Sequence, residues 1–352
     1  VGYDDGTLLV WSRDDRRARE DAEAHAPHAL TLLRWSPGGE WLITADARAE
    51  ASGELPELTL WRVDAQGRPT VRCSYRRPGV GCMRHAIFRT AGGTKKSVID
   101  SSYAAAECPP FYVSGDGGVI LYANDLGKSS TVVSDLGAPV VALLYDEPSN
   151  VLVAITSANI VATFSLAETK PTQLARVKMS MGKEGLQSAA WASPGHLAIA
   201  SADQVVRVTK LADDEQYILT LMDVPGLEDM GGEKLVTLAD ERGGGKLAAA
   251  TREGHVVAWR HVAGASASEP EKCWEPLQPV CAGEDVTPLE LRFGPREGLL
   301  AMRYRRADGG ASVQLLHETV LRRVMHGEGA LIQESASAVQ LVHAGSASCT
   351  IA

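Results

Sequence analysis

Residues 1–15 read VGYDDGTLLVWSRDD, in which two apolar runs flank the pair Asp5-Gly6. An Asp-Gly pair between apolar runs is a strong signal for a tight β-hairpin, because both central turn residues must adopt φ > 0. The second run ends on Trp11. The stretch therefore predicts a hairpin, and the next question is whether the same unit recurs along the chain.

Six later stretches repeat the pattern of a turn, an apolar strand and a bulky residue near the strand's end. Successive landmark residues lie 42 to 61 positions apart. They are Trp11, Trp61, Tyr122, Phe164, Val208, Trp259 and Leu315.

A second series of signals lies upstream of most of these landmarks. It consists of an apolar strand, a Pro/Gly turn and another apolar strand, as in LTLLRWSPGGEWLITA and LQSAAWASPGHLAIAS. Its strand ends are 46 to 57 positions apart. They are Trp35, Phe88, Tyr145, Trp191, Ala239 and Phe293. Two independent series thus share one period, close to the ~40–50 residues of a four-stranded propeller blade.

This period predicts an all-β protein, a seven-bladed WD40-like β-propeller of four-stranded antiparallel blades. A single blade cannot bury both of its faces, so the blades must stack radially. Small and β-branched residues in the second strands, such as LITA and LAAAT, suit the crowded inner part of such a ring. The apolar spacing near 2 excludes long helical repeats for most of the chain.

The first blade is predicted to be incomplete, because there is no room for its first strand before Trp11. GALIQES or SAVQLVHA near the other end of the chain, or residues upstream of Val1, would have to complete it. The absence of an initial Met suggests a fragment. We expect the propeller to span residues 1–325, and residues 326–352 to form closing strands or a junction towards a following domain.

Composition limits the classes of function. The 352 residues are 45% hydrophobic and 22% charged, with a net charge of −9 that argues against nucleic acid as the main partner. No apolar run approaches the ~18 residues of a membrane span. Six scattered cysteines without a C-x-x-C pair are typical of reduced thiols in a cytosolic compartment.

No catalytic, cofactor-binding or metal-binding residue is predicted. AGGTKKS and ERGGGKLA do not fit the spacing of a phosphate-binding loop, and there is no G-x-S-x-G elbow. His25 and His28, or His255 and His261 with Cys273 and Cys281, lack the tight pairs of zinc sites. The aromatic landmarks are interpreted as structural blade anchors, and Trp35, Trp61, Trp191 and Trp259 are expected to be mostly buried between or within blades. This set is Trp11, Trp35, Trp61, Tyr122, Tyr145, Phe164, Trp191, Trp259 and Phe293.

Four segments interrupt the blade pattern and are expected at the surface, where loops often carry recognition. Residues 13–29 are highly charged and predict an exposed loop or short helix. Residues 44–57 and 90–110 lengthen hairpins, and residues 264–279 form a further loop. The stretch RRPGVGCMRH (76–85) gathers basic residues against the acidic background and is a candidate docking patch.

The D-G-x-L/V-x-x-W turns resemble divergent WD40 repeats, although Ser or Arg follows the Trp and Gly-His pairs are almost lacking. Because of this departure, the sequence does not support the complete Asp-His-Ser/Thr-Trp hydrogen-bond network of WD40 blades. The order of segments is similar to the N-terminal propellers of the intraflagellar transport protein 140 family. The resembling stretches include GYDDGTLLVW, HALTLLRWSPGGEWLITAD, YVSGDGGVILYANDLGKSSTVV, LAAATREGHVVAWRHV and LRFGPREGLLAM.

The resemblance implies a non-enzymatic scaffold in intraflagellar transport complex A, acting in return transport, import of membrane proteins into the cilium, and cilium assembly. It implies as partners the other complex A subunits and cargo adaptors, with membrane association only through partners. It also implies a second propeller after this one, and a location in the cytoplasm, the cilium or flagellum, and the basal body. Two alternatives stay open. One is a propeller enzyme of the glycoside hydrolase or lyase type with carboxylates at the channel mouth, and the other is a vesicle-coat or ubiquitin-ligase adaptor.

Overall fold

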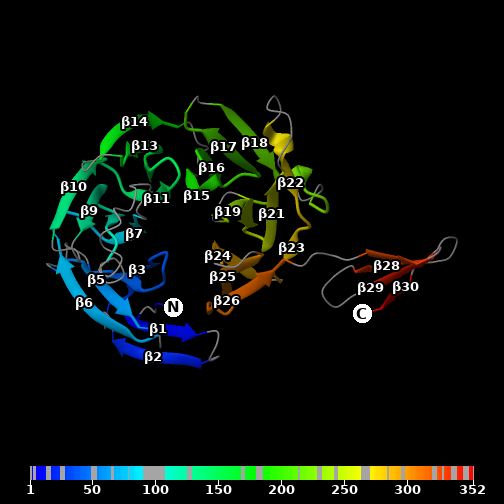
Figure 1. Cartoon of the computed structure of the whole chain (residues 1–352), viewed down its shortest axis with the longest axis horizontal. Coiled ribbons are helices and arrows are strands. Elements are labelled where there is room, and N and C mark those ends of the chain that lie inside the picture. The colour runs from blue at the N-terminus through cyan, green and yellow to red at the C-terminus, as the bar shows by residue number, and fades with distance from the viewer. Residues whose placement is uncertain are drawn as a thin grey trace, which may run out of the picture. The chain divides into compact units, whose positions relative to one another are not determined.

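Antiparallel sheets built from consecutive strands make up most of the described chain (Figure 1). The computed structural model describes residues 2, 5–12, 17–23, 28–48, 54–64, 67–77, 79–89, 108–124, 129–167, 171–179, 185–212, 215–227, 232–241, 245–262, 270–283, 285–294, 298–318, 323–326, 329–333, 339–343 and 349–351. The chain divides into two compact units, Val1–Ala202 with Arg207–Gln216, and Asp203–Val206 with Tyr217–Ala352. Each unit is described by itself.

The first unit contains a succession of four-stranded sheets, each with its strands in chain order. The first sheet is β3 (Leu30–Trp35), β4 (Trp41–Asp46), β5 (Glu57–Val63) and β6 (Pro69–Arg76). The second is β7 (Met83–Phe88), β8 (Phe111–Gly115), β9 (Val119–Asn124) and β10 (Ser129–Asp135). The third is β11 (Val140–Asp146), β12 (Val151–Thr156), β13 (Ile160–Ser165) and β14 (Thr172–Lys178). The fourth is β15 (Leu186–Ser193), β16 (His196–Ser201), β17 (Val205–Lys210) and β18 (Gln216–Thr220), and the division between the units passes through its outer strands.

The second unit contains two further blade sheets. The fifth is β19 (Leu235–Asp240), β20 (Lys246–Thr251), β21 (His255–His261) and β22 (Trp274–Pro276), with the short β23 (Val280–Cys281) also pairing with β21. The sixth is β24 (Val286–Phe293), β25 (Leu299–Arg306) and β26 (Ala311–His317). Two 3₁₀ turns, η3 (Leu221–Asp223) and η4 (Pro270–Cys273), lie between strands.

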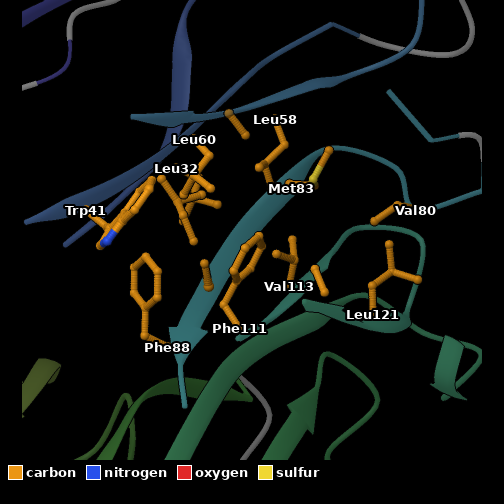
Figure 2. Close-up of a cluster of buried hydrophobic side chains, with 14 residues drawn as sticks. Leu32, Trp41, Leu58, Leu60, Val80, Met83, Phe88, Phe111, Val113 and Leu121 are labelled. Atoms are coloured by element: carbon orange, nitrogen blue, oxygen red, sulfur yellow. The ribbon is translucent and has the colours of Figure 1, made fainter. Parts of the chain in front are cut away.

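The sheets stack because their inner strands are apolar on both faces. All six residues of β4 are buried, as are all six of β20, where KLAAAT supplies small side chains. Figure 2 shows the cluster between the first and second sheets, where Leu32 and Leu60 face Phe88 and Phe111. Similar clusters join the second to the third sheet, the third to the fourth and, in the second unit, the fifth to the sixth.

The described residues contain six blade sheets, which corrects the predicted number of seven. The landmark at Trp11 accounts for the difference. It lies in β1 (Thr7–Ser12), which pairs with β2 (Arg17–Glu23) in a sheet that has two strands among the described residues. The first hairpin signal therefore marked a real turn, with Gly6 at φ +82 and a bridge from Gly2 to Leu8, but not a complete blade.

Two predicted loops are partly strands. Residues 17–23 lie in β2, paired with β1, because backbone pairing with a neighbouring strand overrides the low β-propensity of a charged segment. Residues 270–276 form η4 and β22, in which Trp274 is buried and its indole N–H donates to the hydroxyl of Tyr217 at 3.0 Å. Residues 49–53 and 90–107 of the other two predicted loops lie outside the described residues.

The last landmark, Leu315, is wrong by one position. In the third strands of the first, second, third and fifth sheets the landmark pairs with the second residue of the second strand, as Trp61 does with Leu42 and Trp259 with Leu247. In the sixth sheet that partner is Leu300, which pairs with Leu316. A shift of one residue turns a side chain to the opposite face of a strand, so Leu316 is partly buried against the cluster between the fifth and sixth sheets, whereas Leu315 is 56% exposed.

The C-terminal residues form a sheet of their own, with the order β27 (Arg323–His326), β28 (Gly329–Gln333), β29 (Val339–His343) and β30 (Cys349–Ile351). The segment GALIQES contributes β28 and SAVQLVHA contributes β29, which pair with each other. The role of either segment in completing the first blade stays a prediction, as does the boundary at residue 325.

An ion-pair cluster joins the fifth and sixth sheets of the second unit. The ammonium group of Lys246, whose side chain is only 9% exposed, lies 2.7 Å from Glu318 Oε2 and 3.5 Å from Glu241 Oε1. Arg260 Nη2 lies 2.6 Å from the other oxygen of Glu318. Burial by itself raises the pKa of Glu318, but the hydrogen bonds from Lys246 and Arg260 outweigh burial and lower it below 4.5.

Glu318 should therefore make stability depend on acid pH. A carboxyl whose pKa is lowered by folding stabilises the folded state above its unfolded pKa, and this contribution is lost as the pH falls through the folded pKa. The melting temperature should decline below about pH 4.5, and less steeply in Glu318→Gln than in the parent. The corresponding difference in the free energy of unfolding should be about 1 kcal/mol, because solvent reaches and partly screens the side chains of Glu318 and Arg260, which are 28% and 44% exposed. Thermal melts between pH 3 and 8 measure this, and parallel profiles would contradict it.

Candidate functional site

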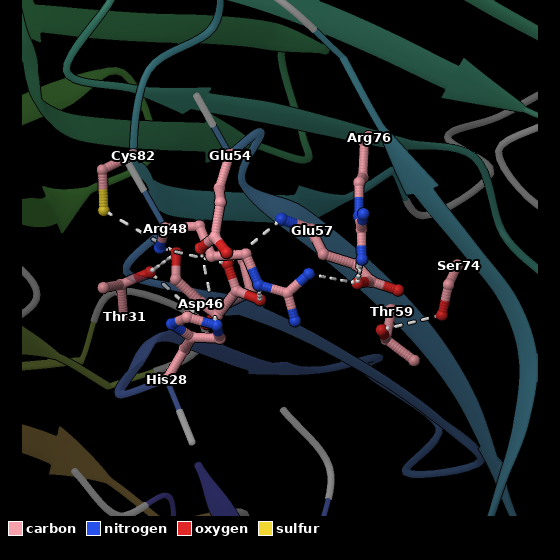
Figure 3. Close-up of polar contacts among 11 residues, drawn as sticks. His28, Thr31, Asp46, Arg48, Glu54, Glu57, Thr59, Ser74, Arg76 and Cys82 are labelled. Carbon is pink, nitrogen blue, oxygen red and sulfur yellow. Dashed lines mark hydrogen bonds and ion pairs between the residues drawn. The ribbon is translucent and has the colours of Figure 1, made fainter. Parts of the chain in front are cut away.

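A cluster of charged side chains lies at one end of the first sheet (Figure 3). We call it the charged cluster, and it comprises His28, Asp46, Arg48, Glu54, Glu57 and Arg76. These residues come from the approach to β3, the end of β4, the β4–β5 connection, the start of β5 and the end of β6. The twist and register of one sheet therefore bring together residues far apart in the sequence.

Asp46 organises the cluster from a fully buried position. Its Oδ1 accepts the backbone N–H of Glu57 at 3.1 Å and that of Arg48 at 3.3 Å, and its Oδ2 lies 3.1 Å from Arg48 Nε. A buried carboxylate is tolerated only where such donors replace water. Asp46 thus fixes both ends of the β4–β5 connection, a structural role.

Glu57 accepts hydrogen bonds from two arginines at the rim of the charged cluster. Its Oε2 lies 3.0 Å from Arg48 Nη1 and 2.7 Å from Arg76 Nη2. Glu57 and Arg76 are directly opposite each other in the β5–β6 pair, where opposite charges stabilise neighbouring strands. The hydrogen bonds to Glu57 raise the pKa of Arg76, so its guanidinium stays charged.

An open depression of about 420 Å³ lies over this cluster, lined by His28, Arg48, Glu54, Leu55 and Arg76. His28 Nε2 lies 3.6 Å from Glu54 Oε2 across it. The lining offers both signs of charge, an imidazole and one leucine, and no nucleophile activated by a base. Such a surface can recognise a polar protein segment.

The cluster is tied to the second sheet. The hydroxyl of Thr31 on β3 lies 2.8 Å from the carbonyl of Met83 on β7 and 3.1 Å from that of Asp46. The thiol of Cys82 lies 3.9 Å from the same Asp46 carbonyl. The first strands of the first and second sheets, β3 and β7, therefore meet beside the depression, and their contact gives the site a rigid base.

Sequence reasoning did not find this cluster. Residues 44–57 were predicted as a lengthened hairpin, and Arg76 belonged to the candidate docking patch 76–85. The signal that could have found it is the cross-strand pair Glu57–Arg76, which becomes visible only when the register of β5 and β6 is known.

The basic residues of the 76–85 stretch are engaged within the protein. Arg76 pairs with Glu57, and Arg77 donates to the backbone carbonyl of Ser130 at 3.1 Å. Arg84 forms two hydrogen bonds to Asp116, at 2.7 and 3.0 Å. Because these contacts engage all three guanidinium groups, unpaired positive charge does not support the predicted docking role of the stretch.

The predicted anchors differ in burial. Trp61 and Trp259 are 3% and 2% exposed, Phe164 and Trp191 are buried, and Tyr122, Tyr145 and Phe293 are partly buried. The side chain of Trp11 lies outside the described part. Their shared role as anchors stays a prediction.

The expectation that Trp35 is buried is wrong, because it is 37% exposed. Trp35 and Trp41 flank the same Ser-Pro-Gly-Gly turn, and Trp41, at 4% exposed, takes the core position. The guanidinium of Arg62 covers the ring of Trp41 at 5.8 Å from its centroid.

Part of the WD40 hydrogen-bond network is present in the first sheet. The indole N–H of Trp61 donates to the hydroxyl of Thr44 on the neighbouring strand at 2.8 Å, with both residues buried. The fifth sheet has Ala249 at the position that corresponds to Thr44, two residues after the partner of its tryptophan. The hydrogen bond from the tryptophan to a hydroxyl on the second strand is therefore present in the first sheet, whereas the fifth sheet lacks the hydroxyl that would accept it.

Within the described ranges no group of three or more His, Cys, Asp or Glu side chains is placed to hold a metal ion. Cys73, Cys82, Cys108, Cys273 and Cys281 are free thiols, and burial raises the pKa of Cys108 to about 12. Among the described residues no helix is long and apolar enough to cross a membrane.

Comparisons with known proteins agree with this fold. The chain is similar to U3-55K (13% identity, TM-score 0.62, covering 90% of each chain). It is also similar to the Cps50 (Swd1) β-propeller domain of Myceliophteria thermophila (14% identity, TM-score 0.60, covering 90% of this chain and 92% of that one). A chain of the mitotic checkpoint complex matches with 12% identity and a TM-score of 0.60, over 90% of this chain and 82% of that one. At these identities the likeness shows the fold, a β-propeller.

The family is shown by the sequence itself. The family model described as IFT140 first beta-propeller matches residues 86–318, from the first strand of the second sheet to the residue after β26. The match covers well over half of the 352 residues. The chain therefore belongs to the family of IFT140 first β-propellers.

Proposed function

We propose that this propeller is a non-enzymatic scaffold module of intraflagellar transport complex A. It acts through protein–protein interactions in return transport along the cilium, import of membrane proteins and cilium assembly. Its partners are other complex A subunits and cargo adaptors, and its membrane association is through them. It works in the cytoplasm, at the basal body and in the cilium. The propeller itself comprises residues 1–325, and residues 326–352 form closing strands or a junction towards a following domain.

The observation that carries this proposal is the family match over residues 86–318. The charged cluster supports it chemically, because its side chains are held by one another at the rim of an open depression. Pre-oriented charges of both signs can recognise a protein surface of complementary charge. Standard protein interfaces bury about 1,600 Å², an area that strand ends and loops of neighbouring blades together can supply.

The rival enzyme hypothesis requires carboxylates free to act as acid, base or nucleophile. Two of the buried carboxylates among the described residues are engaged instead. Asp46 is held by Arg48, and Asp146 accepts a hydrogen bond from the hydroxyl of Ser149. Glu233 Oε1 lies 2.8 Å from His255 Nδ1 without a hydrogen bond between them. The contacts of Asp46 and Asp146 support a structural use of these two carboxylates.

Affinity purification tests the proposal against the adaptor alternatives. The full-length protein and a version lacking this propeller are tagged and expressed in ciliated cells, and co-purifying chains are identified. We expect complex A subunits with the full-length protein and a reduced set without the propeller. Recovery of coat or ubiquitin-ligase subunits in place of complex A subunits would refute the assignment.

A further inference from the structure

The outer edge of β26 differs from the outer edges of the other blade sheets. The third strands of the first and third sheets, β5 and β13, are buried on both faces and covered by a fourth strand. β26 is also a third strand, but none of its seven residues is buried, and no strand pairs with its outer edge among the described residues. Among the described residues, the sixth sheet therefore lacks the fourth strand that covers the third strand in the first and third sheets.

The hydrogen-bonding pattern identifies which groups this edge presents. Glu318 N–H donates to the Gly298 carbonyl and Arg306 N–H to the Gly310 carbonyl, so the even-numbered residues of β26 turn their backbone groups towards β25. In an antiparallel pair this direction alternates from residue to residue. The backbone N–H and C=O groups of Ala311, Val313, Leu315 and His317 therefore point away from the sheet.

The side chains beside this edge are apolar and basic on one face. Val313 and Leu315 are each 56% exposed. Val313 is paired across the strands with Arg303, and Ala311 with Arg305, so these four side chains lie on the same face. Natural proteins usually protect a free apolar edge with charge, proline or a covering segment, so an uncovered one indicates a docking position.

Arg305 gives this face its charge preference. Its neighbours across the two adjacent strands are Thr287 and Ala311, both small and neutral, and it has no ion-pair partner among the described residues. Arg303, by contrast, pairs with Glu290 at 3.5 Å. Over the small side chain of Ala311, the long Arg305 side chain reaches a strand docked at about 4.8 Å from β26.

We propose that the free edge of β26 binds an extended segment of a partner protein, which adds an antiparallel fourth strand to the sixth sheet. The segment reads apolar-x-apolar-x-acidic, with its apolar side chains beside Leu315 and Val313 and its carboxylate opposite Ala311, within reach of Arg305. Backbone pairing supplies the affinity, and the alternate side chains supply the specificity. A second copy of this chain is disfavoured because its own edge carries no carboxylate in this register.

This inference deepens the scaffold proposal, since it states the chemistry of one partner. Its test needs no ciliary component, so the peptide result and the purification result can fail independently. The probes are two fluorescent nine-residue peptides, Thr-Ser-Ile-Thr-Val-Ser-Glu-Thr-Ser and the same sequence with Lys in place of Glu. Fluorescence anisotropy measures their binding to the whole chain.

The charge is tested by Arg305→Glu, with Arg306→Glu as the matched control. Arg306 is exposed, carries the same charge and lies one residue along β25, so its side chain points to the other face. We expect Arg305→Glu to weaken the Glu peptide about fivefold and to bind the Lys peptide more tightly than the parent does. Arg306→Glu should leave both affinities unchanged. Equal effects of the two substitutions would overturn the proposal.

The backbone pairing is tested by Val313→Pro, which removes one outward N–H while leaving the bonds to β25 intact. Both peptides should lose binding while the melting temperature stays near that of the parent. If proline lowers the melting temperature, Val313→Lys gives the same test by placing a charge beside the docked apolar side chains. Absence of saturable binding by the parent at millimolar peptide, retained binding in these variants, or a dimer of the parent that Val313→Lys dissociates would each overturn the proposal.

Discussion

Trp61→Ala is expected to lower the free energy of unfolding by about 3–5 kcal/mol. Trp61 is 3% exposed, and its indole donates to the buried hydroxyl of Thr44 at 2.8 Å. The substitution removes the largest side chain of that strand and the buried hydrogen bond that the indole donates to Thr44, so the cost of a cavity and the loss of a hydrogen bond add together. Trp259→Ala should have a similar effect through the cavity alone, since Trp259 is 2% exposed.

The matched control is Trp35→Ala in the same sheet. Trp35 is 37% exposed, so its removal should lower the free energy of unfolding by about 1 kcal/mol or less. Urea unfolding of the parent and the variants measures the difference. Equal losses for Trp61→Ala and Trp35→Ala would show that the two tryptophans contribute alike, contrary to their positions in the first sheet.

Gly115→Ala should destabilise the second sheet by about 3 kcal/mol. A Cβ at Gly115 would lie 2.0 Å from the Cys82 carbonyl oxygen and 2.9 Å from the Met83 Cα. Both are backbone atoms, which cannot rotate away as a side chain can, so the β7–β8 pair must separate. A Cβ at the neighbouring Gly117 would likewise lie 2.6 Å from the Val80 carbonyl oxygen.

Gly38→Ala serves as the control for this substitution. Gly38 lies in the exposed Ser-Pro-Gly-Gly turn, and a Cβ there would meet no atom within 4 Å. Its melting temperature should stay close to that of the parent, whereas Gly115→Ala should melt several degrees lower. A Gly115→Ala variant as stable as Gly38→Ala would contradict the close approach of the two backbones.

The fold was largely predictable from the sequence because blade sheets repeat. Strand pairs such as LTLLRW and WLITAD carry apolar residues and a Pro/Gly turn, and these local signals marked the sheets. The number of blades was not predictable in the same way. The hairpin at Asp5-Gly6 has the same local chemistry as a blade hairpin. It is distinguished by its sheet, which has two strands, β1 and β2, among the described residues.

The charged cluster and the β26 edge were beyond sequence reasoning for a related reason. Asp46, Glu57 and Arg76 lie on three strands and Arg48 lies on the β4–β5 connection. Their convergence depends on register, which single-residue shifts alter. Leu315 illustrates the difficulty, because a shift of one position separates a side chain that packs against the core from an exposed one. Trp35 and Trp41 show it again, since composition alone does not indicate which of them enters the core.

The central claim, that this propeller serves as a scaffold in ciliary transport, is tested most directly by a deletion in cells. Cells without the native copy receive either the full-length protein or the same protein lacking this propeller, and return traffic along the cilium is measured. We predict impaired return traffic and reduced recovery of complex A subunits for the deletion. Normal cilia with normal return traffic and unchanged recovery of those subunits would contradict it.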